Sequence, residues 1–224
     1  MTYELTLQKI QPVTHDTHHL VFDRPGGYEF TPGQATDLTL AKEGWKDEAR
    51  PFTFVNLPGS NTLEFVIKSY PDHDGVTEQI GMMTAGDKVT VTDPWGAIHD
   101  EGPGYFIAGG AGVTPFIAVL RKRLAQRGNL DDCTLIFSNR TEADIILRDE
   151  FEAMKGLRTV FTVTDEKEAG VQSAQIDKTF LSRNIVPESG HYYICGPEPM
   201  IDDITAALKE LGVSENRIVV EGLD

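Results

Sequence analysis

The sequence of 224 residues predicts two domains, a six-stranded antiparallel β-barrel followed by a doubly wound α/β domain with a parallel sheet of about five strands. Two observations predict this fold. Short segments of alternating polar and apolar residues fill the first half, whereas near-continuous apolar runs separated by helical periods fill the second. A short polar segment rich in Gly and Pro, 100–104, divides them. We therefore expect domains at 1–99 and 104–224.

Six segments of the first half alternate as half-buried strands do. Turn signals such as Pro32-Gly33 and Pro58-Gly59 separate them, and short strands at this spacing are typical of an antiparallel barrel or sandwich. One helix is expected to interrupt the series near 77–80. The expected strands are 3–7, 19–22, 36–40, 52–55, 63–67 and 88–91.

The apolar runs of the second half are typical of strands buried on both faces. Helical periods over 115–127 and 199–211 lie between them, and Gly128 and Gly212 are the expected helix stops. This βαβ repetition predicts a mostly parallel sheet with helices on both faces. The expected strands are 105–108, 134–137, 159–163, 192–195 and 218–220.

Charge and composition restrict the function. The net charge of −15 disfavours nucleic acid, because phosphate contacts need clustered Lys and Arg, and also disfavours a strongly acidic protein partner. The two cysteines, Cys133 and Cys195, are fewer than the roughly four thiolates of an iron–sulfur cluster. No apolar run approaches the ~18 residues of a membrane span, and the first residues lack the apolar core of a signal peptide. We expect a cytoplasmic protein.

The segment Arg50-Pro51-Phe52-Thr53 brings a cation, an aromatic face and a hydroxyl together at the start of an apolar strand. A flat cofactor that carries phosphate needs such groups. Strand alternation puts Arg50 and Phe52 on one face and Thr53 on the other, unless the backbone is irregular. The alternative is an ordinary strand start with an exposed Arg and a core Phe.

A glycine-rich turn follows the first buried strand of the second half. In Gly110-x-Gly112-x-Thr114-Pro115, the glycines permit a diphosphate to approach the backbone, and the helix start offers unpaired N–H groups. Thr114 is the expected N-cap and Pro115 the first helical residue. Pro115 replaces the third Gly of the dinucleotide fingerprint, so a purely structural turn is the alternative.

Cys195-Gly196-Pro197 ends the fourth buried strand of the second half. Ligands of doubly wound sheets lie over the carboxyl ends of the strands, so Cys195 is expected to face the same crevice as Gly112 and Thr114. The alternative is a small buried residue that only packs.

These motifs occur in one order along the chain, together with Gly75-Val76-Thr77, Pro94-Trp95-Gly96 and Glu221. In this order the chain resembles the ferredoxin–NADP⁺ reductase-like flavoprotein family from end to end. The resemblance implies FAD, a nicotinamide nucleotide and electron transfer to a separate external acceptor, such as a ferredoxin, a flavodoxin or another redox protein.

The resemblance also implies roles for single residues in flavin binding. Arg50 would hold the FAD diphosphate, Phe52 (where the family usually has Tyr) would stack on the flavin, and Thr53 would hydrogen-bond near its reactive nitrogen. Losing the Tyr hydroxyl costs at most ~1 kcal/mol of flavin binding. The remaining flavin contacts would come from the backbone of Val66 and Lys68 and from the second diphosphate loop, Gly75, Val76 and Thr77.

For the nicotinamide nucleotide, the resemblance implies binding by Gly110, Gly112, Thr114 and Pro115, with Cys195, Gly196 and Pro197 against the nicotinamide and Glu221 nearby. NADH is favoured over NADPH, because Asp165 and Glu166 would repel a 2′-phosphate and accept hydrogen bonds from a ribose diol. The cations Arg140 and Lys167 would instead favour NADPH.

We expect three further features to have structural roles. His15, His18 and His19 are expected to be surface residues without a metal, and Trp95 to pack in the core. The acidic residues of 142–152 are expected to form a solvated helix face. The sequence therefore favours an FAD-containing NAD(P)H reductase. The alternatives are a flavin-binding electron-transfer subunit that is inactive alone, or a nucleotide-binding sensor.

Overall fold

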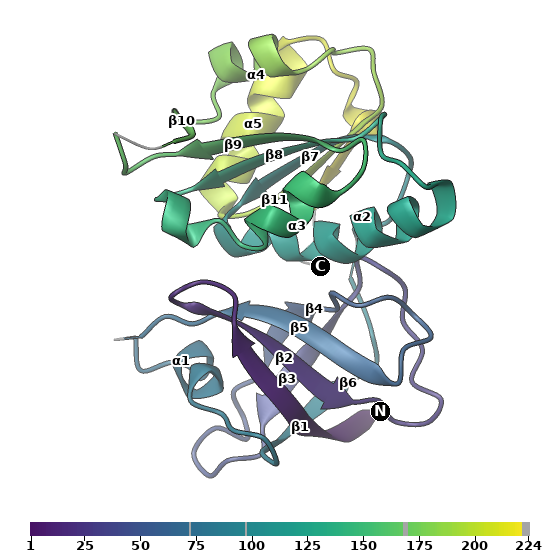
Figure 1. The fold of residues 1–224 in the computed structure, drawn as a ribbon, viewed down its shortest axis with the longest axis vertical. Helices are drawn as coiled ribbons and strands as arrows, with labels where there is room; N and C mark the ends of the chain where they lie inside the picture. Colours follow the sequence, from purple (N-terminus) through teal and green to yellow (C-terminus); the bar gives the residue numbers. More distant parts are fainter. Residues whose placement is uncertain (72, 97, 168–169, 221–224) are drawn as a thin grey trace.

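The computed structural model describes residues 1–71, 73–96, 98–167 and 170–220. Figure 1 shows two bodies stacked along the long axis, with the N-terminal strands in one and the second half of the chain in the other. The predicted boundary segment follows the last strand of the first body, and its final residue, Gly104, begins the first strand of the second.

The first body is a nearly closed antiparallel barrel whose described strands follow the order β4-β3-β6-β1-β2-β5. The two edge strands meet where the Val55 N–H donates to the Glu64 carbonyl at 2.9 Å and a bridge joins Phe54 to Phe65. The elements are β1 (Thr2–Pro12), β2 (Thr17–Asp23), β3 (Ala35–Leu40), β4 (Arg50–Thr53), β5 (Thr62–Lys68), α1 (Val76–Gly81) and β6 (Lys88–Thr92).

The second body is a parallel sheet whose described strands follow the order β10-β9-β8-β7-β11-β12. Its strands are β7 (Gly104–Gly109), β8 (Thr134–Asn139), β9 (Arg158–Val163), β10 (Gln172–Ser173), β11 (His191–Cys195) and β12 (Ile218–Val220). Its helices are α2 (Thr114–Arg127), α3 (Arg148–Ala153), α4 (Lys178–Asn184) and α5 (Glu198–Glu210), with 3₁₀ turns η1 (Gly110–Val113), η2 (Glu142–Asp144) and η3 (Glu215–Arg217).

The helices cover both faces of this sheet. Helices α2 and α3 lie between the sheet and the barrel, and α4 and α5 cover the opposite face (Figure 1). Residues 115–120 of α2 are all buried, because the helix lies between the sheet and the barrel, and Val55 and Val66 of the barrel belong to the same hydrophobic cluster as most of these residues. The start of α2 is therefore fixed at the junction of the two domains.

The predicted fold is confirmed, and each expected strand is present. The short edge strand β10 and helix α4 were not predicted. The acidic face expected over 142–152 is wrong, because the segment forms the turn η2 and the separate helix α3. Thr114 is not an N-cap: it already has helical φ and ψ, and its hydroxyl donates to the Ala111 carbonyl at 3.0 Å.

Candidate functional site

A cavity of about 940 Å³ lies between the two domains. Its barrel wall includes Pro51, Phe52 and Thr53, and its α/β wall includes the turn 109–112 and Cys195. These segments are far apart in sequence. The volume falls within the ~300–1,000 Å³ typical of small-molecule sites, so the fold brings most of the predicted site residues to one ligand-sized space.

The barrel wall is built around β3. Ala35 pairs with Thr53 on one side and with Trp95 on the other, where N–H groups and carbonyls are exchanged at 2.6 and 2.8 Å. Thr53 is buried, Phe52 and Trp95 are half-buried, and all three line the cavity. The expectation that Trp95 packs in the core is wrong. Its indole Nε1 is buried and has no hydrogen-bond partner among the described residues, so the wall offers a donor for a ligand.

Arg50 lies outside the cavity lining. Its guanidinium contacts Glu48 at 2.9 Å and the Ala49 carbonyl at 2.7 Å, and half of its side chain is exposed. Phe52 and Thr53, which strict alternation would place on opposite faces, both line the cavity. A contact between Arg50 and a diphosphate stays a prediction.

The α/β wall presents backbone. Gly110 has φ of +53°, and a Cβ atom there would meet no other atom within 4 Å, so its backbone faces open space. A Cβ atom on Gly112 would lie 2.4 Å from the Cys195 carbonyl oxygen. Only glycine permits η1 to lie this close to the end of β11, and this contact brings Gly112, Thr114 and Cys195 to the same cavity.

The carboxyl ends of β8 and β9 supply polar groups to the same cavity. Arg140 Nε donates to Asp165 Oδ2 at 2.8 Å, and the Thr164 hydroxyl donates to Asp165 Oδ1 at 3.0 Å. These hydrogen bonds, the one from Arg140 first, lower the pKa of Asp165. Asn139 was missed by the sequence analysis. It is 6% exposed, and neither atom of its amide has a partner among the described residues, so the wall contains an unused donor and acceptor.

Lys68 joins the two domains at the cavity. Its ammonium contacts Asp16 of the barrel at 2.8 Å and Asp144 of the α/β domain at 3.1 Å. Burial alone would raise the pKa of both carboxylates. The hydrogen bonds they accept from Lys68 and nearby Thr hydroxyls outweigh this, and each pKa lies below its usual value. Burial alone would lower the pKa of Lys68, but the two carboxylates raise it.

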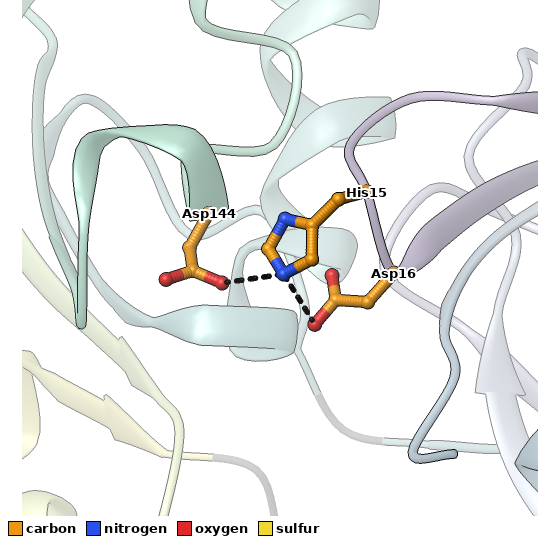
Figure 2. A group of neighbouring side chains, drawn as sticks. All are labelled: His15, Asp16 and Asp144. Atoms are coloured by element: carbon orange, nitrogen blue, oxygen red, sulfur yellow. Dashed lines mark ion pairs between the residues drawn. The ribbon is translucent and has the colours of Figure 1, made fainter.

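His15 completes this group. Figure 2 shows its ring between the two carboxylates, with Nε2 at 3.6 Å from Asp16 and 3.9 Å from Asp144. The ligand atoms of His15, Asp16 and Asp144 lie within 4.8 Å of one another, as metal ligands can. The ammonium of Lys68 already contacts both carboxylates and neutralises part of their charge.

Two sets of predictions were partly wrong here. Asp144, expected on a solvated face, is buried in the cavity wall, and a capping box with Thr141 fixes its carboxylate. The spacing Thr141-x-x-Asp144 is the sequence signal that could have revealed it. Of the three histidines expected at the surface, His15 is exposed. His18 and His19 are half-buried, and His19 lies 2.9 Å from Glu64.

The remaining predicted residues divide into three groups. Those that also line the cavity are Val66, Lys68, Thr77, Pro115, Gly196 and Pro197. Gly75 and Val76 are not part of the lining: Gly75 precedes α1, and Val76 packs in the barrel core. Glu221 lies outside the described residues.

Comparison with known proteins matches a different domain family to each half of the chain. Residues 4–99 match the oxidoreductase FAD-binding domain, and residues 106–206 match the oxidoreductase NAD-binding domain. The chain is 29% identical to NADH-cytochrome b5 reductase 2 of Mycosarcoma maydis, over 90% of this chain and 63% of that protein. It is 30% identical to the reductase component of propane 2-monooxygenase of Rhodococcus jostii (strain RHA1), over 94% of this chain and 60% of that protein. The chain thus spans about 60% of the length of these relatives.

A solved structure supports the fold. The ferredoxin NADP⁺ reductase of Neisseria gonorrhoeae with bound FAD and NADP superposes with a TM-score of 0.85 at 22% identity, over 98% of this chain and 97% of that one. Within the part of this chain that the structure describes, no helix is both long and apolar enough to cross a membrane.

Proposed function

Because the chain belongs to the ferredoxin–NADP⁺ reductase-like family of FAD- and NAD-binding oxidoreductases, we propose that it is an NAD(P)H reductase that passes electrons through FAD to a separate acceptor. The interdomain cavity is the observation that carries this proposal. One wall supplies aromatic and hydroxyl groups, and the other supplies glycine backbone at the start of a helix. The proposed domains are 1–99 for FAD and 104–224 for the nicotinamide nucleotide.

The cavity fits the two cofactors. Phe52 offers an aromatic face, Thr53 a buried hydroxyl, and Trp95 and Asn139 polar atoms without partners among the described residues. Gly110 leaves open space where a side chain would otherwise project. The cofactors supply the chemistry, which is hydride transfer from nicotinamide to flavin followed by release of electrons to the acceptor.

The residues of this chain would bind the two cofactors and orient them toward each other. On the flavin side, we propose that Phe52 stacks on the ring system, that Thr53 hydrogen-bonds near its reactive nitrogen, and that Arg50 binds the diphosphate. The backbone of Val66 and Lys68 lines the ring, and Gly75, Val76 and Thr77 form the second diphosphate loop. Arg50 reaches a diphosphate by exchanging its contact with Glu48, which is exposed to solvent.

On the nucleotide side, we propose that Gly110, Gly112, Thr114 and Pro115 bind the dinucleotide. Cys195, Gly196 and Pro197 lie against the nicotinamide, with Glu221 nearby. The burial of Cys195 supports a role in shaping the site and excluding water.

We propose NADH as the preferred donor. Asp165 holds Arg140 in an ion pair, so the cation that could bind a 2′-phosphate already has a carboxylate partner. Asp165 itself can accept hydrogen bonds from a ribose diol. Glu166 accepts a hydrogen bond from the Glu142 N–H at 2.8 Å and is not part of the cavity lining, so Asp165 is the residue on which the preference depends.

The acceptor is proposed to be a redox protein without a strongly acidic docking face, given the net charge of −15. A second function, the electron-transfer subunit of a larger oxidoreductase, is favoured by the similarity to a monooxygenase reductase component. A cytoplasmic location stays a prediction.

Purified protein tests the proposal. We expect a yellow preparation whose flavin absorbance bleaches under anaerobic NADH, more slowly under NADPH, and which reduces ferricyanide without other proteins. Bleaching without turnover unless a partner is added would favour the subunit. A preparation that binds FAD and is not bleached by either nucleotide would refute the reductase.

A further inference from the structure

We propose that Arg121 is a positioning residue that fixes the nucleotide-binding helix α2 relative to the chain segment directly after the flavin-binding strand β4. This inference rests on the function proposed above. The guanidinium of Arg121 lies at the domain interface, where Nη1 donates to the Val55 carbonyl of the barrel at 2.7 Å.

Both residues of this contact are close in sequence to segments that line the cavity. Val55 is fully buried and stands two residues after Thr53, and its N–H already forms the hydrogen bond that closes the barrel. Its carbonyl therefore belongs to a rigid part of the barrel. On the other side, Arg121 follows Thr114 by seven residues, about two helical turns or ~10 Å. A rigid helix thus connects the contact to the glycine-rich turn at the cavity.

Glu150 fixes the guanidinium in place. Arg121 Nε and Nη2 donate to the two carboxylate oxygens of Glu150 at 2.7 and 2.8 Å. This two-point contact sets the plane of the guanidinium and leaves Nη1 directed at Val55. A lysine at this position could reach one of these partners but could not reproduce the fork.

The charges around Arg121 match this role. The residue faces Glu150 of α3 and lies near Glu64 of the barrel. The pKa of Glu64 is lowered chiefly by the hydrogen bond from His19 and also by the charge of Arg121. Arg121 is only 26% exposed, so solvent screens its contacts less than those of a surface pair.

Arg121 and Lys68 contact the opposite domain at different places. Lys68 of the barrel pairs with Asp144 at the cavity, whereas Arg121 of α2 reaches the barrel away from the cavity lining. The Lys68 contact alone would permit the domains to rotate about it, and Arg121 restricts that rotation together with the apolar cluster at the interface. Loss of Arg121 is therefore expected to loosen the relative orientation of the two walls, with every cavity-lining side chain left in place.

The test compares Arg121→Met with Arg127→Met in the FAD-loaded protein. Arg127 is a matched control on the same helix, because its guanidinium pairs with Asp132 at 2.8 Å in its own domain and is half exposed. Three quantities are measured: the rate of flavin bleaching at saturating NADH, the Kd for NAD⁺, and the radius of gyration by small-angle X-ray scattering.

We expect Arg121→Met to slow bleaching about tenfold or more, since small misplacements of reacting groups are costly. The Kd for NAD⁺ should stay nearly unchanged, and the radius of gyration should increase. Arg127→Met should resemble the wild type in each measurement, and Arg121→Lys should recover part of the lost rate. A wild-type rate and an unchanged radius of gyration in Arg121→Met would overturn the proposal.

Glu150→Gln provides a second route if Arg121→Met does not fold. It keeps the guanidinium and weakens its support, so an intermediate rate and a larger radius of gyration are expected. Wild-type values of both would overturn the proposal. Scattering is independent of turnover. An inactive wild type would therefore refute the proposed function, while the effect of Arg121→Met on the radius of gyration would still decide whether Arg121 joins the domains.

Discussion

The barrel wall of the cavity presents side chains, chiefly Phe52, Thr53 and Trp95, whereas the α/β wall presents backbone around Gly110 and Gly112. An aromatic ring system is recognised by faces and directed hydroxyls, which only side chains supply. A diphosphate is recognised by close backbone N–H groups, which a side chain would block. The two walls should therefore respond to opposite kinds of mutation, one to the removal of atoms and the other to their addition.

Adding one atom to the α/β wall should have the largest effect. In Gly112→Ala, the new Cβ would lie 2.4 Å from the Cys195 oxygen and 2.5 Å from its carbon. Because both are backbone atoms, β11 and η1 must separate, at a cost of about 1–3 kcal/mol of stability. We expect FAD to remain bound while NAD⁺ affinity, measured by titration, falls strongly.

Gly26→Ala is the control, because no atom lies within 4 Å of its Cβ position, and it should match the wild type. If Gly112→Ala binds NAD⁺ normally, the glycine-backbone description of this wall is wrong.

The second largest effects are expected from removing side chains at or beside the barrel wall. Arg50→Ala should weaken FAD binding about tenfold to hundredfold, since hydrogen bonds to a charged group contribute about 1.5–3 kcal/mol. Thr53→Ala should retain FAD and slow its reduction by NADH. Flavin release on ultrafiltration and stopped-flow bleaching measure the two effects.

Lys46→Ala, which removes another cation of the same exposed loop, should leave FAD binding unchanged. Should Arg50→Ala and Thr53→Ala both keep FAD and the full rate, side chains would not be what the barrel wall contributes.

Breaking the Lys68 contact between the two walls should have a smaller effect, namely a pH-dependent loss of stability. Asp16 and Asp144 have lowered pKa values. The stability they contribute is therefore present above their unfolded pKa of ~3.9 and is lost as the pH falls through their folded pKa. Lys68→Met should cost about 1 kcal/mol at neutral pH, because the two carboxylates lose the hydrogen bonds from its ammonium and keep those from nearby Thr hydroxyls.

Urea denaturation of wild type and Lys68→Met at several pH values measures this. The difference should shrink as the pH falls below ~4, because the carboxylates then become protonated, first in the unfolded chain and at lower pH in the folded protein. A difference that is independent of pH would show that Lys68 acts through packing alone.

The smallest effect is expected from a mutation of Asp165, a side chain of the α/β wall. Asp165→Asn should release Arg140 and raise kcat/KM for NADPH about threefold, a modest change because both groups are exposed and screened. Steady-state rates with the two nucleotides measure it. Glu188→Gln, an exposed charge that is not part of the cavity lining, is the control, and an equal change in both variants would assign the effect to net charge.

Much of the fold could be predicted because the periodicity of strands and helices is visible in short stretches of sequence. Alternation marked the barrel strands, and apolar runs marked β7, β8, β9, β11 and β12. The edge strand β10 has two residues, too few for any period. Helix capping was misjudged at Thr114, because whether a Thr precedes a helix or begins it depends on the turn before it, here η1.

The cavity lining was predictable where a motif is contiguous, as in 51–53 and most of 110–115. Lys68 was named only for its backbone, and Asp144 and Arg121 were not recognised. Their partners lie on the other domain, and no local pattern encodes such a pairing. The amide of Asn139 has no partner among the described residues, so no pairing within the chain could have pointed to it.

The sequence by itself determined the two architectures, their order and the contiguous motifs proposed to meet a flavin and a dinucleotide, because side-chain period and glycine spacing are properties of neighbouring residues. The tertiary structure decided which of these residues share a cavity and what holds its walls together. Those outcomes depend on pairs such as Lys68 with Asp144 and Arg121 with Val55, whose contacts exist only after the barrel and the α/β domain have packed against each other.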